Sequence, residues 1–165
     1  MGKLCRYLTA KDREFAARQR MFFVASAADA EVNLAPKGED CLLFLDEETL
    51  LLLDYPGSTN RTGRDILAGG GVTLMFCSFD DDPRVLRIFC KGDVIEKDSQ
   101  RFEETVRLFP DGNPSIVRQV FRLRVEAVEN SCGLSVPVMR FERVREGGVK
   151  HWAEKKAEAS KSNKA

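Results

Sequence analysis

The sequence is poor in the side chains from which metal sites and disulfide frameworks are built. It contains one histidine, His151, and five widely spaced cysteines, none of which forms a C-x-x-C pair. Transition-metal sites gather several imidazole or thiolate ligands, and disulfide frameworks need cysteines in pairs. We therefore expect neither a metal site nor a disulfide framework, and we interpret the cysteines as free, buried thiols in a reducing compartment.

An excess of one charge and a long uninterrupted apolar segment are also missing. Lys plus Arg and Asp plus Glu number 26 each, so the chain has no net charge with which to attract nucleic acid or an anionic membrane. The most apolar stretch, residues 42–55, is interrupted by Asp46, Glu47 and Glu48, each of which would cost about 3 kcal/mol in hydrocarbon. Residues 1–6 lack the apolar run of a secretory signal. We expect a cytoplasmic protein that binds neither nucleic acid nor membranes.

The length and composition are those of a single folded unit with a short appendage. The chain has 165 residues, of which 43% are hydrophobic and 32% charged, the balance of a soluble globular domain. From Lys150 onward the composition changes to Lys, Glu, Ala and Ser, which favours a short helix around Trp152 and then a solvated tail. We expect one domain over residues 1–148, followed by a short helix and a basic tail over residues 149–165.

Runs of strand-forming residues separated by short polar turns dominate the rest of the chain. Predicted strands cover residues 21–27, 31–36, 41–45, 49–54, 72–79, 85–95, 119–128 and 139–144. One predicted helix begins after Thr9 and runs to Arg20. A second covers residues 60–67 and is capped by Ser58 or Thr59, and a third lies in the region 99–109. Because the strands and helices do not alternate as βαβ units, the pattern predicts a mainly β fold, an antiparallel barrel of six to eight strands with accessory helices.

Polar side chains gather at two places where an anion could bind. Residues 57–62 combine hydroxyl groups, an amide and the guanidinium of Arg61 at a predicted helix start, where free N–H groups and a partial positive charge favour phosphate. An ordinary capped helix is the alternative, and this segment alone favours it. In the preceding hairpin, Asn33, Ala35 and Lys37 share one strand face because side chains alternate with period two.

Two further sets of residues are weaker candidates. Arg87 lies between Leu86 and Ile88 near a strand start, where its side chain could face an anion. The triplet Ser131, Cys132 and Gly133 follows a predicted strand, but no histidine lies nearby in sequence to act as a base. We therefore disfavour a cysteine hydrolase.

Seven segments carry a resemblance through their order and spacing: residues 21–27, 32–38, 53–62, 72–77, 83–88, 131–137 and 152–156. Together they resemble the pyridoxamine 5'-phosphate oxidase-related flavoproteins. The resemblance implies an FMN-binding split barrel, a homodimer that holds two flavins at the subunit interface. It implies that the flavin ring and ribityl chain lie against Asn33, Pro36 and Lys37. It further implies that the phosphate meets Ser58, Thr59, Asn60 and Arg61. Arg87 and the turn formed by Ser131, Cys132 and Gly133 would contribute from the same or the partner subunit.

The first hypothesis for function is an FMN-dependent oxidoreductase that acts on a small organic substrate. Flavin chemistry needs little from the protein beyond positioning, so no catalytic residue is assigned. The pyridoxamine phosphate oxidases themselves end in an Arg- and Trp-bearing segment, whereas this sequence ends in lysines. Vitamin B6 oxidation is therefore not the expected reaction. The alternatives are a non-catalytic flavin-binding or flavin-sensing module, and a haem-binding split barrel with His151 as its ligand.

Overall fold

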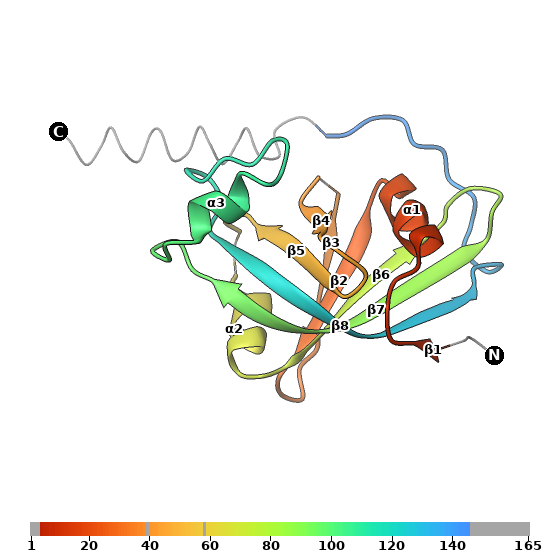
Figure 1. Ribbon diagram of the computed structural model, residues 1–165. Helices are drawn as coiled ribbons and strands as arrows, with labels where there is room; N and C mark the ends of the chain where they lie inside the picture. Colours follow the sequence, from red (N-terminus) through yellow and green to blue (C-terminus); the bar gives the residue numbers. More distant parts are fainter. Residues whose placement is uncertain (1–3, 39, 58, 146–165) are drawn as a thin grey trace.

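The computed structural model describes residues 4–38, 40–57 and 59–145 (Figure 1). Its elements in chain order are β1 (Leu4–Cys5), α1 (Ala10–Arg18), β2 (Phe22–Ala27), β3 (Asn33–Lys37), β4 (Leu42–Phe44), β5 (Thr49–Asp54), α2 (Arg61–Leu67), β6 (Gly71–Cys77), β7 (Arg84–Ile95), α3 (Phe102–Val106) and β8 (Gln119–Cys132).

The strands of the described residues form one eight-stranded antiparallel sheet, which curls into a half-barrel (Figure 1). Its order is β3-β2-β6-β7-β8-β5-β4, and the short β1 pairs with β8. The two longest strands, β7 and β8, pair from Arg84 opposite Cys132 to Ile95 opposite Val120. This arrangement confirms the predicted mainly β class and the predicted strand number. No helix among the described residues is long and apolar enough to cross a membrane.

The hydrophobic core fills the inside of the curl and the space beneath α1. Phe15 of α1, Phe76 of β6 and Phe121 of β8 belong to one cluster of buried side chains. Residues 50–54 of β5 are all buried, which explains why that strand reads as a continuous apolar run. Each fully buried Leu or Phe side chain stabilises the fold by roughly 1.5–3 kcal/mol. This core holds the strand ends in fixed positions at the rim of the barrel.

A β-bulge interrupts the alternation of buried and exposed side chains along β8. Leu123 and Val125 face the core and Arg122 is exposed, as a half-buried strand requires. Phe89 pairs with Ala127 but Cys90 pairs with Val125, so Glu126 is an extra residue in the ladder. An extra residue reverses the facing of those that follow. Val128, which strict alternation places with the arginines, is therefore fully buried.

The helix after Thr9 is confirmed, with a capping box between Thr9 and Asp12, and it ends at Arg18. The third helix is shorter than the predicted region 99–109, although three apolar side chains at helical spacing in that region are buried: Phe102, Val106 and Phe109.

The predicted strand over residues 139–144 is wrong. Residues 133–145 have no regular structure and run past α1 as the blue segment of Figure 1. The Met139 N–H donates to the Phe79 carbonyl, with 2.8 Å between N and O, and the ring of Phe141 lies under the guanidinium of Arg20. Within residues 139–144 the side chains of Met139, Phe141 and Val144 remain more than half exposed, and the segment pairs with no strand of the described sheet. Strand-forming residues without a partner strand do not make a strand. The predicted helix around Trp152, and His151, lie outside the described residues.

None of the five cysteines, which all lie among the described residues, forms a disulfide, and the prediction that their thiols are buried is confirmed for three of them. Cys41, Cys77 and Cys90 are buried, whereas Cys5 is half-buried and Cys132 is exposed.

Candidate functional site

A hollow of about 150 Å³ lies where β3, the end of β5, the start of α2 and the residue before β8 meet. It brings together residues that the sequence places far apart. Its lining residues are Asn33, Ala35, Lys37, Asp54, Tyr55, Gly57, Thr59, Asn60, Arg61, Thr62 and Arg118. The structure thus gathers five of the predicted site residues, namely Asn33, Lys37, Thr59, Asn60 and Arg61. Ser58 lies outside the described residues.

The period-two alternation of β3 positions Asn33 on the hollow, where its side chain ties the hairpin to α2. The Asn33 Nδ2 donates to Thr62 Oγ1 at 3.0 Å and to Ser26 Oγ at 3.2 Å. The Ser26 hydroxyl, which is buried, donates in turn to Asp65 Oδ2 at 2.6 Å. These bonds connect α2 to both β2 and β3 at the wall of the hollow. Pro36 faces the opposite side of β3, is exposed and does not line the hollow.

A buried carboxylate, that of Asp54, lies at the base of the hollow. Nε and Nη2 of Arg118 both lie 2.9 Å from its Oδ2, and Gln119 Nε2 donates to the same oxygen at 2.8 Å. The other oxygen, Oδ1, lies 4.0 Å from Nζ of Lys37. One carboxylate therefore holds two cations that both border the hollow.

Arg118 also fastens the loop that connects β5 to α2. Its Nη2 donates to the carbonyl oxygens of Thr59, at 3.1 Å, and of Tyr55, at 3.4 Å. Its own backbone N–H donates to the Asp54 carbonyl at 2.8 Å. The loop is thereby held at both ends, which places Thr59 and the start of α2 beside Lys37.

The start of α2 differs from the prediction that Ser58 or Thr59 caps it. The cap position is Asn60, whose side chain makes no capping hydrogen bond. Its Oδ1 instead accepts from Gln119 Nε2 at 2.6 Å. A Cβ atom on Gly63 would lie 2.5 Å from that Oδ1 and 2.7 Å from Nε2, closer than real Cβ atoms approach. The contact between Asn60 and Gln119 therefore requires a glycine one turn into the helix.

The charge on the walls of the hollow is positive. Lys37, Arg61 and Arg118 contribute three cations against the single carboxylate of Asp54. Arg61 also pairs with Glu31, whose side chain is 79% exposed, so solvent screens that pair strongly. A half-buried cluster with this balance, supplemented by amide and hydroxyl groups, suits an anion with several acceptor oxygens.

The remaining predicted residues lie at the other end of β7 and β8. Arg87 pairs opposite Glu129, and its Nη1 donates to Glu129 Oε2 at 3.2 Å and to Ser131 Oγ at 3.3 Å. None of these residues lines the hollow. Within one subunit, Arg87, Ser131, Cys132 and Gly133 do not reach the hollow.

Sequence reasoning missed Asp54, Arg118 and Gln119. The available signal was the acidic residue that closes β5 directly after four consecutive leucines. A carboxylate at the end of so apolar a strand needs a partner, because a buried charge must be paired. The identity of that partner depends on the register that pairs Asp54 with Gln119, which local pattern does not give.

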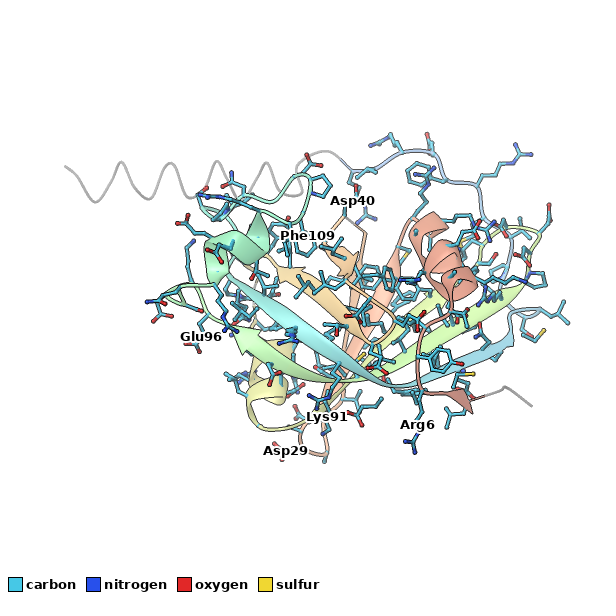
Figure 2. All side chains as sticks on the ribbon, viewed as in Figure 1. Arg6, Asp29, Asp40, Lys91, Glu96 and Phe109 are labelled. Atoms are coloured by element: carbon cyan, nitrogen blue, oxygen red, sulfur yellow. The ribbon has the colours of Figure 1, made fainter. Side chains whose placement is uncertain are left out.

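A second, larger cavity of about 590 Å³ adjoins the hollow and shares Tyr55 with it. Its walls are mainly aromatic and aliphatic, and Phe22 and Phe76 stack there with ring centroids 5.1 Å apart. Polar residues, among them Arg20 and Asp40, complete its lining. Figure 2 shows Asp40 at the side of the barrel that carries α3, with Lys91 on the opposite side. No sequence pattern predicted this cavity.

A third polar cluster, formed by Asp12, Arg84 and Asn130, ties α1 to β7 and β8. The Asp12 carboxylate accepts from Arg84, from Thr9 and, at 3.0 Å, from Asn130 Nδ2. Burial alone would raise the pKa of Asp12, but the hydrogen bonds from Thr9 and Asn130 and the charge of Arg84 lower it overall. The guanidinium of Arg84 donates to Asp12 and Asn130 and lies over the ring of Phe15. Because its donors are used within the protein, we interpret this cluster as a contact that stabilises the fold.

The protein is a split antiparallel half-barrel with a cationic hollow beside its edge hairpin. Residues 8–132 match the family described as pyridoxamine 5'-phosphate oxidase, and the chain belongs to this family. This confirms the resemblance inferred from the sequence.

Comparisons with individual proteins agree with that assignment. Over 133 residues the chain is 37% identical to the pyridoxamine 5'-phosphate oxidase family protein ustO of Aspergillus flavus, an alignment that covers 77% of this chain and 53% of that protein. The chain thus spans about half the length of this curated relative. Among solved structures, HupZ of Group A Streptococcus superposes with a TM-score of 0.60 at 17% identity, covering 81% of this chain and 99% of HupZ. A Lactobacillus delbrueckii protein described as a pyridoxamine 5'-phosphate oxidase superposes with a TM-score of 0.60 at 19% identity, covering 75% and 94%. Both structures support the fold.

Proposed function

We propose that this protein binds FMN, with the phosphate of the cofactor in the hollow, and that it is an oxidoreductase acting on a small organic substrate. The observation that carries the proposal is the convergence of Lys37, Arg61 and Arg118 on one hollow in a chain of this family. Arginine forks and a lysine ammonium are the usual partners of phosphate oxygens.

When bound, FMN supplies hydride transfer at N5 of its ring, and the residues of the chain bind and orient it. Lys37 and Arg118 neutralise the phosphate, while Asn60 and Thr62 border it with an amide and a hydroxyl group. A volume of about 150 Å³ is well below the roughly 300–1,000 Å³ that encloses a whole ligand of this size. The flavin ring must therefore lie outside the hollow.

A second copy of the chain is the proposed cover for that ring. The edge strand β3 exposes apolar side chains beside the hollow, with Leu34 63% exposed, and the preceding Val32 is 68% exposed. An uncovered edge strand with apolar side chains favours association. A homodimer would bury these side chains and enclose the ring between subunits.

The larger cavity is the proposed site for the substrate. Its volume of about 590 Å³ falls in the range of small-molecule sites, and its stacked phenylalanines suit an apolar, planar compound. Since the cavity and the hollow share Tyr55, a substrate there would lie next to the cofactor.

Spectroscopy of the purified protein tests the proposal. We expect the absorbance bands of a flavin and a dimer by light scattering. Denaturation should release a compound with the mass of FMN. Reduction by NADH or NADPH with many turnovers on an electron acceptor would support an enzyme, and a single reduction without turnover would indicate a flavin-binding module. A colourless protein that takes up no FMN on titration would overturn the proposal.

A further inference from the structure

Asp54 presents a puzzle, because a carboxylate at the base of an anion site repels the anion. It is nevertheless buried there, with its side chain 7% exposed. We propose that Asp54 is the positioning residue of the hollow, which orients the donors of three other side chains toward the phosphate. This inference rests on the proposed function of the hollow.

The first donor that Asp54 orients is Arg118. The carboxylate holds Nε and Nη2, and Nη2 also serves the carbonyl groups of Thr59 and Tyr55. Nη1 is then the nitrogen of the guanidinium for which the described residues supply no acceptor. Arg118 lines the hollow with its side chain only 27% exposed, so a bound anion is the partner that its geometry suits.

The second oriented group is the amide of Asn60, reached through Gln119. A carboxylate only accepts hydrogen bonds, so the Gln119 atom that faces Asp54 at 2.8 Å must be its nitrogen. The same nitrogen faces Asn60 at 2.6 Å, so the Asn60 atom there must be oxygen. The NH₂ group of Asn60 is thereby turned away from Gln119 as a donor on a residue that lines the hollow. The charge of Asp54 thus sets the direction of both amides.

The third oriented group is the ammonium of Lys37, 4.0 Å from Oδ1 of Asp54. At that distance the pair is electrostatic rather than a tight hydrogen bond, and the ammonium keeps its donors for a ligand. Asp54 therefore adds one negative charge to the site, and it orients two cations and one amide.

The substitution Asp54→Asn separates this idea from simple electrostatics. Removing a negative charge should by itself tighten the binding of FMN. The positioning role predicts the opposite. The Asn oxygen must face Arg118 and Gln119, where it accepts weaker hydrogen bonds than a carboxylate oxygen, and the Asn NH₂ group then faces the Lys37 ammonium in place of a negative charge. We expect the Kd for FMN to rise about tenfold, the effect of losing roughly one hydrogen bond to a charged group, and the Kd for riboflavin, which has no phosphate, to stay unchanged.

The experiment measures the Kd values of FMN and riboflavin by fluorescence quenching in the wild type, Asp54→Asn, Gln119→Met and Asp93→Asn. Gln119→Met interrupts the connection to Asn60 without changing any charge, and should also weaken FMN selectively. Asp93, exposed on β7, is the matched control and should behave as the wild type. FMN binding in Asp54→Asn that equals or exceeds the wild type, or equal losses of FMN and riboflavin in both variants, would overturn the inference. If Asp54→Asn does not fold, Gln119→Met decides alone. Wild-type protein that does not prefer FMN to riboflavin would instead overturn the proposed function.

Discussion

Arg118 and Asp54 are 64 residues apart in the sequence, yet Nε of the guanidinium lies 2.9 Å from Oδ2 of the carboxylate. The antiparallel pairing of β5 with β8 creates this contact by setting Asp54 opposite Gln119, so that Arg118, directly before β8, lies beside the end of β5. The pair stabilises the barrel by joining β5 to the start of β8, and it also holds Arg118 at the hollow. Substitutions here should therefore affect folding and ligand binding together.

Replacing Arg118 by Ala should weaken both properties. The change leaves the buried Asp54 without its main partner and frees the Thr59 carbonyl, and we expect a loss of about 2 kcal/mol in the free energy of unfolding. The Kd for FMN should rise at least about tenfold. Urea denaturation and fluorescence titration measure the two effects. The control is Arg124→Ala on the same strand, where the side chain is 65% exposed, and the expected change is within about 0.5 kcal/mol. A stable, fully binding Arg118→Ala protein would contradict the importance of this pair.

Replacing Gly63 by Ala should harm the site although it favours the helix. Alanine is intrinsically better than glycine in a helix by about 1 kcal/mol. The added Cβ would nevertheless lie 2.5 Å from Asn60 Oδ1, so the bond between Asn60 and Gln119 must break. We expect a net loss of stability, measured by thermal denaturation, and weaker FMN binding. Gly71→Ala is the control, since nothing lies within 4 Å of its Cβ position. A Gly63→Ala protein more stable than the wild type would show that the contact is dispensable.

Local patterns predicted the sheet well because each strand carries its own signal. The alternation in β8 and the capping box at Thr9 depend on a few neighbouring residues. The strand predicted over residues 139–144 failed because its side chains favour a strand only where a partner strand is available. The bulge at Glu126 was missed because it appears only in the register between β7 and β8.

The candidate site was predictable only in part, for a related reason. Asn33 and Lys37 emerged from period-two alternation, and Asn60 and Arg61 from the start of a helix. These signals lie within short segments. Arg118 reaches the hollow only because β5 pairs with β8, and the sequence around it contains no motif. The role of Arg87 through a partner subunit stays a prediction.

The five cysteines should differ sharply in their reactivity. Burial raises the pKa of Cys90 to about 12 and also raises that of Cys77, so neither forms a thiolate readily. Cys132 is exposed. With a maleimide reagent at pH 7.5, we expect Cys132 to be labelled first, and Cys77 and Cys90 only after unfolding. Intact mass and peptide mapping over time measure this order. Cys132→Ser should remove the fast phase, and fast labelling of Cys90 in the folded protein would contradict the described core.

The Asp12 cluster should make stability depend on pH in the acid range. The folded-state pKa of Asp12 lies below the unfolded value near 3.8. A lowered pKa means that the carboxylate stabilises the fold above the unfolded pKa, and that this contribution disappears as pH falls through the folded pKa. Asp12→Asn should therefore be less stable than the wild type at pH 6, with a difference that shrinks steadily below pH 4. Urea denaturation at a series of pH values measures the difference. The exposed Asp93→Asn variant is the control, and a difference between Asp12→Asn and the wild type that stays constant down to pH 2 would show that the charge of Asp12 contributes nothing.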